Sequence, residues 1–163
     1  MQKLHWIQHK IYSREALTRQ CNIWRITGKK IVFTNGCFDI LHHGHLALLA
    51  EAADLGNILI VGLNTDSSVQ RLKGPERPIT NENDRLFQIA SLLCTSAVCL
   101  FDEDTPENLI QLIRPDVLVK GGDYTIDKIV GANYVQSHGG SVEIIPFVNG
   151  YSTSSIISRI KRL

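Results

Sequence analysis

Two histidines, His42 and His45, stand three residues apart in the sequence, with Gly44 between them. Imidazole groups at this spacing can both point at the same phosphate, and the glycine allows a ligand to come close to the backbone. At a phosphoryl centre such groups donate hydrogen bonds to oxygens that gain charge in the transition state, which is worth about 3–4 kcal/mol for each donor. No nucleophilic side chain is needed, because the phosphate of a substrate can itself attack. The pattern therefore predicts group transfer at a phosphate.

A short polar turn precedes these histidines. Residues 30–34 (KIVFT) are β-branched and aromatic, which indicates a buried strand, and residues 35–39 (NGCFD) follow it. Glycine and small polar residues after a strand let backbone N–H groups approach an anion, and the helix expected from residue 43 adds its free N–H groups and its dipole. We therefore predict a phosphate-binding site formed by Thr34, Asn35, Gly36, Cys37, Phe38, His42, Gly44 and His45.

Two other interpretations of this segment stay open. The two histidines, with Asp39 as a third ligand, could bind a metal ion. Cys37 could be a reactive thiol, although its neighbours do not suggest a nucleophile. A purely structural role is disfavoured, because polar residues at a strand-to-helix turn have no packing reason to be there.

Short apolar runs alternate with longer amphipathic segments along the rest of the chain. We expect strands at 30–34, 58–63, 97–101, 117–120 and 142–146. We expect helices at 43–55, 81–93, 152–163 and, more weakly, about 128–138, and another that begins at Thr105-Pro106-Glu107 with Thr105 as its N-cap. Apolar strands separated by helices predict an α/β fold: a doubly wound, Rossmann-like, five-stranded parallel sheet with helices on both faces. Ligands of such folds bind beyond the carboxyl ends of the strands.

Composition excludes several classes of protein. The 163 residues have a net charge of +1, which gives no overall attraction to nucleic acid or to membranes, and no apolar run reaches the length of a transmembrane helix. None of the four cysteines stands in a C-x-x-C pair, so a structural zinc site is disfavoured and a cytoplasmic protein with reduced thiols is the simplest account. Neither G-x-G-x-x-G after the first strand nor G-x-x-x-x-G-K-[ST] is present, which argues against a dehydrogenase and a P-loop kinase.

Two domain segments are expected. Residues 1–29 stand outside the alternating pattern and are predicted to be a helical N-terminal extension, with Ser13 as a helix cap. Residues 30–163 carry the predicted site. Its last helix begins with a glycine and a run of hydroxyl side chains, which can bind phosphate at a helix N-terminus: Gly150, Ser152, Thr153, Ser154 and Ser155. Helix capping alone would account for one of these hydroxyls.

The segment T-N-G-C-F-D-I-L-H-H-G-H at 34–45 resembles the signature of the H-x-G-H nucleotidyltransferases, the cytidylyltransferase-like superfamily, and G-Y-S-T-S-S at 150–155 resembles its second signature. The resemblance extends over 30–163. It implies that V-K-G-G-D-Y at 119–124 lies against the nucleotide through Lys120, Gly121 and Asp123, and that the hydroxyls of the last helix bind the β- and γ-phosphates. Phe147 departs from the pattern, because cytidylyltransferases of this type carry an arginine there.

By the same resemblance, the region after the second strand supplies polar and basic residues to the acceptor substrate. These are Asn64, Asp66, Arg71, Lys73, Arg77 and Arg85, joined by Asp39, and Lys73 also acts in catalysis with His42 and His45. Glycine and proline among these charges predict a mobile loop.

The combination of motifs most closely resembles the adenylyltransferases of D-glycero-β-D-manno-heptose 1-phosphate, in a stand-alone form without a kinase domain. The resemblance implies transfer of AMP from ATP to that sugar phosphate for bacterial surface polysaccharide, with Mg²⁺ held mainly by phosphates rather than by protein side chains, in a cytoplasmic homodimer. Another acceptor, such as glycerol 3-phosphate or a different sugar 1-phosphate, is the first alternative. A nucleotide-binding module without catalysis is the second, and the intact histidine pair argues against it.

Overall fold

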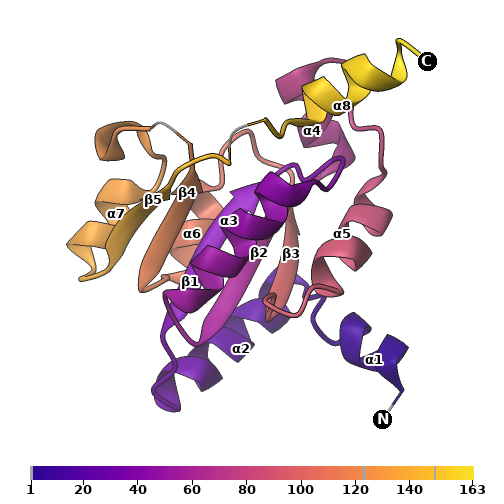
Figure 1. Ribbon diagram of the computed structural model, residues 1–163. Coiled ribbons are helices and arrows are strands. Elements are labelled where there is room, and N and C mark those ends of the chain that lie inside the picture. The colour runs from indigo at the N-terminus through magenta and orange to yellow at the C-terminus, as the bar shows by residue number, and fades with distance from the viewer. Residues whose placement is uncertain (1, 123, 149) are drawn as a thin grey trace.

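Five parallel strands form one sheet in the order β3-β2-β1-β4-β5 (Figure 1). The strands are β1 (Ile31–Gly36), β2 (Ile58–Asn64), β3 (Ala97–Phe101), β4 (Val117–Gly121) and β5 (Ser141–Ile145). The computed structural model describes residues 2–122, 124–148 and 150–163. All five predicted strands are present, and the predicted doubly wound parallel α/β fold is confirmed.

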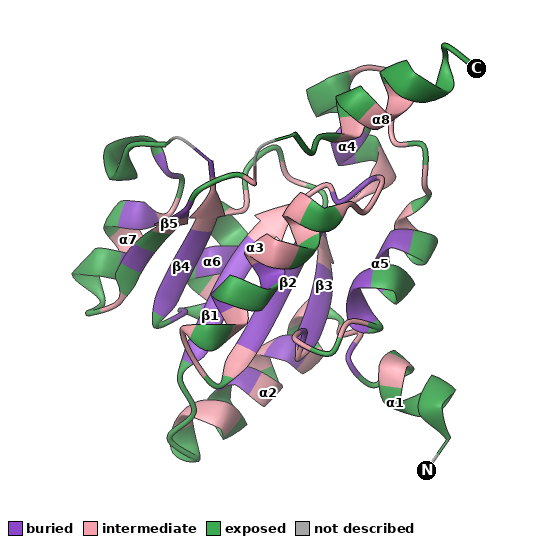
Figure 2. Ribbon diagram, in the orientation of Figure 1, coloured by how far each residue is buried: buried purple, intermediate pink, exposed green. Residues whose placement is uncertain are grey.

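Helices cover both faces of the sheet, because successive strand residues point to opposite sides. On one side, Phe33, Ile60 and Leu118 join a buried cluster with residues from α2 (Arg14–Ile26), α6 (Glu107–Ile113) and α7 (Ala132–Ser137). On the other side, Val32 and Val61 join a cluster with α3 (His43–Asp54) and α5 (Glu82–Ala90). Figure 2 shows this pattern as a buried sheet between partly exposed helices. This alternation is the ordinary geometry of a strand that is buried on both faces.

The helices differ from the predicted ones in three places. Residues 66–73, predicted to belong to a mobile loop, form α4 (Asp66–Lys73), which Thr65 caps by accepting a hydrogen bond from the Ser68 N–H. Helix α6 begins at Glu107 with Pro106 at its N-cap, so the prediction that Thr105 caps it was wrong. The weak helix expected at about 128–138 is divided into the 3₁₀ turn η1 (Ile126–Lys128) and α7, because Gly131 intervenes with a positive φ of 84°. The last helix, α8 (Thr153–Ile160), lies with α4 beyond the carboxyl ends of the strands (Figure 1).

The segment before β1 packs onto this sheet. It contains α1 (Lys3–Gln8) and α2, which Ser13 caps as predicted. Leu17 and Cys21 of α2 are fully buried in the core cluster. The domain boundary at residue 29 stays a prediction, but the packing shows that α2 shares a hydrophobic core with the strands. Within the described residues, no helix is both long and apolar enough to cross a membrane.

Replacement of Leu17 by alanine tests how far α2 contributes to the stability of the domain. We expect Leu17→Ala to lower the free energy of unfolding by about 2–5 kcal/mol, because it leaves a cavity in the core. The matched control is Leu93→Ala, since Leu93 is 92% exposed. Urea denaturation of both variants measures the difference, and equal stabilities would contradict a shared core.

Candidate active site

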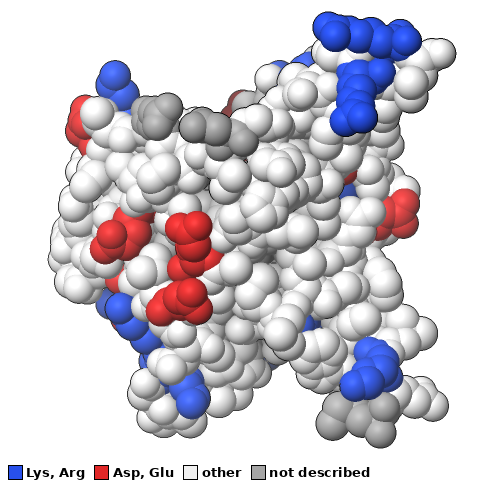
Figure 3. Space-filling model, viewed as in Figure 1, with Lys and Arg blue, Asp and Glu red and all other residues white. Residues whose placement is uncertain are grey.

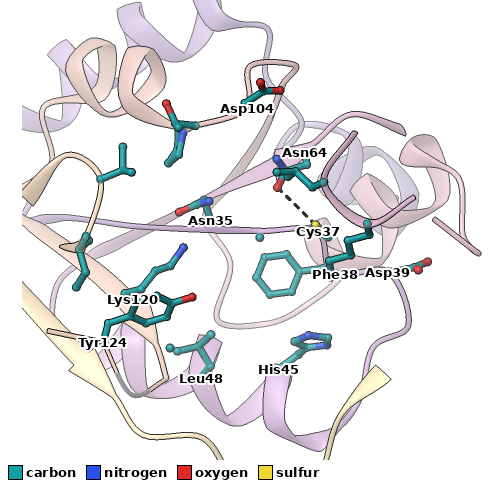
Figure 4. A pocket seen from close by; sticks show the side chains of 18 of the residues that line it. Asn35, Cys37, Phe38, Asp39, His45, Leu48, Asn64, Asp104, Lys120 and Tyr124 are labelled. Carbon is teal, nitrogen blue, oxygen red and sulfur yellow. Dashed lines mark hydrogen bonds between the residues drawn. The ribbon is translucent and has the colours of Figure 1, made fainter. Parts of the chain in front are cut away.

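A cavity of about 570 Å³ lies at the carboxyl ends of β1 and β4 (Figure 4). Strand β1 is the point where the sheet reverses, because the chain passes from β1 to β2 on one side and later places β4 on the other. This is the location at which doubly wound sheets bind ligands. Of the predicted site residues, the cavity is lined by Asn35, Gly36, Cys37, Phe38, Asp39, His45, Asn64, Lys73, Lys120, Gly121 and Thr153.

The turn after β1 has an unusual backbone. Phe38 has a φ of 46°, which side chains rarely adopt and which costs of order 1 kcal/mol or more. The Phe38 ring passes so close to Gly36 that a Cβ there would lie 2.9 Å from it, so the glycine is needed for this packing. The same ring contacts His45 edge-on at 5.2 Å between centroids. Phe38 therefore helps to fix the orientation of the His45 ring by packing against it.

The two histidines form a stacked pair at the start of α3. Their ring centroids are 3.8 Å apart and the rings are 19° from parallel. His42 is the N-cap residue, and its side chain makes no capping hydrogen bond. The Nδ1 atoms of both rings are buried without a protein partner, and so is the hydroxyl of Thr34. Buried polar atoms without partners are rare in folded proteins, so this group is suited to binding a ligand.

Burial favours the neutral form of both imidazoles. Burial lowers the pKa of His45 to about 4, with further contributions from His42 and the Lys73 ammonium. Burial also lowers the pKa of His42. A neutral imidazole carries one N–H donor and one acceptor nitrogen, so each ring can still donate a hydrogen bond to a phosphate oxygen.

Lys120 and aromatic side chains form the β4 side of the cavity. Burial lowers the pKa of Lys120, whose Nζ lies 5.8 Å from the centre of the Tyr124 ring. Gly122 has a φ of 121°, and a Cβ on it would lie 2.7 Å from the Phe147 ring. Only glycine allows the backbone and Phe147 to come so close. Asp123, predicted to contact the nucleotide, lies outside the described residues.

The start of α8 contributes one hydroxyl to the cavity. Thr153 lines it, whereas Ser152 caps the helix by accepting a hydrogen bond from the Ser155 N–H at 3.1 Å. Ser154 and Ser155 are exposed and do not line the cavity, and Gly150 precedes them with a φ of 86°. The ordinary capping explanation thus accounts for Ser152, and the phosphate-binding role of this run stays a prediction.

Asp39 has its carboxylate fully engaged by the protein. It accepts hydrogen bonds from the Ile79 and Thr80 N–H groups at 2.7 and 2.9 Å and from the Arg77 Nε at 2.6 Å, and it is only 2% exposed. Arg77, predicted to bind the acceptor, is therefore held by Asp39. Asp39 and Arg77 together anchor the loop after α4. To bind substrate as predicted, each would have to contact the substrate while it keeps its hydrogen bond to the other.

Arg85 is buried beneath the turn. It has no exposed surface, donates from one nitrogen to the Cys37 carbonyl and from another to Asp66 Oδ1, each at 2.7 Å, and does not line the cavity. Asp66 is predicted to contact the acceptor and instead pairs with Arg85. Arg71 is likewise outside the cavity lining and pairs with Asp104 at 2.9 Å. The predicted substrate contacts of these three residues stay predictions.

Several cavity-lining residues were not expected from the sequence: Leu48, Leu72, Asp104, Thr105, Pro106, Leu118, Tyr124, Lys128, Ile129, Val130 and Phe147. The segment 104–106 follows β3, and the rule that ligands bind after strand ends could have identified it. Its sequence otherwise indicates only the start of a helix. Residues 128–130 carry no such signal.

The charged side chains of the surface and of the cavity indicate which kind of ligand the site suits. On the face shown in Figure 3, Lys and Arg form separate groups, one of them over the end of α8, and no continuous basic band is visible. Among the described residues there is no group of three or more His, Cys, Asp or Glu side chains that could hold a metal ion. The donors around the cavity are mainly imidazole, ammonium and hydroxyl groups, which suit phosphate better than a cation.

Comparison with known proteins agrees with this geometry. A family described as cytidylyltransferase-like matches residues 33–159. The chain belongs to the cytidylyltransferase-like family. It is 52% identical over 151 residues to the bifunctional protein HldE of Trichlorobacter lovleyi, covering 93% of this chain and 31% of that protein, and 51% identical over 158 residues to HldE of a Marinomonas species, covering 97% and 33%. The chain thus spans about a third of these relatives.

Two solved structures resemble this cytidylyltransferase-like chain. The lipopolysaccharide core biosynthesis protein from Thermoplasma volcanium is 31% identical, with a TM-score of 0.60, and the match covers 77% of this chain and all of that one. Pantoate-beta-alanine ligase from Francisella tularensis matches with a TM-score of 0.63 at 17% identity over 94% of this chain and 72% of that one, which shows a shared fold.

The lowered pKa of His45 predicts how stability depends on pH. In an unfolded chain the imidazole has its ordinary pKa of 6.5, whereas in the folded protein the pKa is about 4. The unfolded state therefore binds the proton first, and the stabilisation that is present above pH 6.5 is lost as the pH falls toward 4. We expect the free energy of unfolding of His45→Gln to fall less between pH 6.5 and 4 than that of the wild type. Urea denaturation at several pH values measures this difference. An unchanged pH dependence in that variant, relative to His43→Gln, would contradict the burial of His45.

The anchoring role of Asp39 can be tested with Asp39→Asn. The amide keeps the size of the side chain but removes the charge that Arg77 requires, and breaking a buried ion pair costs about 3 kcal/mol. We expect a loss of unfolding free energy of that order and faster proteolysis in the loop at 74–81. The control is Asp54→Asn at an exposed position. Wild-type stability of Asp39→Asn would show that the carboxylate does not hold the loop.

Proposed function

We propose that this chain is an adenylyltransferase that transfers AMP from ATP to D-glycero-β-D-manno-heptose 1-phosphate, giving ADP-heptose and diphosphate. An oxygen of the sugar phosphate attacks the α-phosphorus of ATP, and the bond from that phosphorus to the oxygen of the leaving diphosphate breaks. The observation that carries the proposal is the stacked pair of His42 and His45, whose buried Nδ1 atoms lack protein partners at the switch point of a cytidylyltransferase-like sheet.

The residues at the cavity suit the charge changes of this reaction. Oxygens on the α-phosphate gain charge in the transition state, and the N–H groups of His42, His45 and the first turn of α3 can stabilise them. Lys73 and Lys120 both line the cavity and can neutralise phosphate charge. The low pKa of a buried ammonium such as Lys120 is raised again when an anion binds beside it. Thr153, at the start of α8, lines the cavity, and its hydroxyl can donate to the leaving diphosphate.

The identity of the acceptor follows from similarity. The motifs resemble those of heptose 1-phosphate adenylyltransferases, two relatives are named bifunctional protein HldE, and a solved relative is named a lipopolysaccharide core biosynthesis protein. An ADP-activated heptose is a precursor suited to lipopolysaccharide. Its synthesis from ATP belongs in the cytoplasm, where ATP is supplied.

Mg²⁺ is the cofactor that this proposal requires. The donor groups of the cavity fit phosphates, so we assign the metal to the phosphate oxygens of ATP rather than to a protein cage. When bound, Mg²⁺ neutralises charge on these oxygens. A homodimer is also proposed, and sedimentation of the purified chain tests it.

The acceptor and the nucleotide can be tested together by measuring diphosphate release. We expect ATP with heptose 1-phosphate to be the best combination, ahead of CTP with the same sugar and ahead of ATP or CTP with glycerol 3-phosphate. Mass spectrometry of the product should show ADP-heptose. If glycerol 3-phosphate with CTP gave the higher kcat/KM, the chain would be a cytidylyltransferase for another acceptor.

The catalytic role of the histidines predicts large effects of their removal. We expect His42→Ala and His45→Ala each to lower kcat by about 10²–10³-fold, because each removes a donor to the transition state. His43→Ala is the matched control, since His43 is exposed and its ring centroid lies 5.0 Å from that of Tyr151. Its kcat should stay within a few-fold of wild type. Retained activity in a double variant that lacks both His42 and His45 would overturn the assignment.

A further inference from the structure

The segment before the family-matched region is joined to the wall of the cavity. Residues 10–12 run alongside β3: the Val98 N–H donates to the Lys10 carbonyl at 2.8 Å, and the Tyr12 N–H donates to the Val98 carbonyl at 2.9 Å. Helix α2 begins immediately afterwards, at Arg14. The position of Arg14 is thus fixed relative to β3 and to the loop that follows this strand.

Arg14 forms a two-pronged ion pair with Glu103 in that loop. One guanidinium nitrogen lies 2.8 Å from Oε1 and the other 2.5 Å from Oε2. Both side chains are about one-third exposed. The hydrogen bonds from Arg14 hold the pKa of Glu103 at about 2, which shows how closely the carboxylate is engaged. Parallel hydrogen bonds of this kind fix direction as well as distance.

The next residues of the loop are part of the cavity. Asp104, Thr105 and Pro106, which we call the 104–106 wall, all line it. The loop is also tied to the floor of the cavity, because Ser68 Oγ donates to the Glu103 carbonyl at 3.3 Å and Asn64 donates to Ser68 Oγ at 3.0 Å. The wall is therefore held from two directions, by Arg14 from outside the cavity and by Asn64 through Ser68 from within it.

The topology assigns this wall to the acceptor. Lys120 and Gly121, which suit the nucleotide, stand at the carboxyl end of β4, on one side of β1. Asn64 ends β2 and the 104–106 wall follows β3, and both of these strands lie on the opposite side of β1. Two substrates that react at the histidines above β1 must approach from different sides, because both cannot occupy the same space. The acceptor therefore lies toward the 104–106 wall.

We propose that Arg14 is a positioning residue for the acceptor substrate: its ion pair with Glu103 holds the 104–106 wall in the place where the sugar phosphate binds. This proposal rests on the proposed function for the identity of the acceptor. It gives the segment before the family-matched region a part in substrate recognition. Arg14 itself does not line the cavity, so its effect passes through Glu103.

The kinetic test compares Arg14→Ala with Arg19→Ala, an exposed arginine of the same helix. We expect Arg14→Ala to raise the KM for heptose 1-phosphate about five- to tenfold, with the KM for ATP within twofold of wild type. This is less than the loss of a buried charge-assisted hydrogen bond, because the pair is about one-third exposed and acts through the wall. Arg19→Ala should change neither. Arg14→Lys keeps the charge without the two-pronged geometry and should fall between them. The exchange Arg14→Glu with Glu103→Arg should recover part of the loss.

Amide hydrogen exchange tests the role of Arg14 without any acceptor substrate. Amide hydrogen exchange at residues 102–108 should become faster in Arg14→Ala than in Arg19→Ala, while exchange in β1 and α3 stays unchanged. If the wild-type chain forms no ADP-heptose, the proposed function fails, and exchange alone then decides whether Arg14 holds the wall. Unchanged exchange, or an equal rise in both KM values, would overturn the role of Arg14.

Discussion

The candidate site depends on one strained residue, Phe38. Its left-handed backbone lets the chain reverse between β1 and α3 so that the Phe38 ring packs against His45, which lines the cavity and stacks on His42. Such a conformation persists only when its neighbours impose it. Here the carbonyl before Phe38 is bound by the buried Arg85, and the carboxylate after it is bound by Arg77 and two amides. Residues predicted to hold substrate thus hold the turn that presents the histidines.

The sequence predicted the framework well, because buried parallel strands leave a strong signal. All five strands and the helix that starts at His43 follow from apolar runs and from the glycine and polar residues that bound them. Helix α4 was missed because its residues, DSSVQRLK, are mostly polar and stand next to glycine and proline. Its helical state depends on the Thr65 cap and on burial of Val69, which are tertiary features. Thr105 failed as a cap for a similar reason: several polar residues precede α6, and local sequence does not decide between them.

The site was predicted in outline and less well in detail. The sequence located the histidine turn and the glycines after β4, since both follow strand ends. It could not separate basic residues that face the cavity from those that pair with carboxylates elsewhere in the fold. Arg71, Arg77 and Arg85 all have acidic partners distant in sequence, whereas Lys73 lines the cavity. A motif specifies residue types, and pairing over long sequence separations decides which charges remain available to a ligand.

The contact of residues 10–12 with β3 also matters for the behaviour of the protein in concentrated solution. A strand at the border of a sheet exposes unpaired N–H and C=O groups, which can recruit strands from other molecules. Here Val98 gives both its N–H and its carbonyl to the chain's own N-terminal segment. At the opposite border, β5 carries the exposed charged side chain of Glu143. Both borders thus discourage intermolecular strand pairing, which protects an otherwise apolar sheet from aggregation.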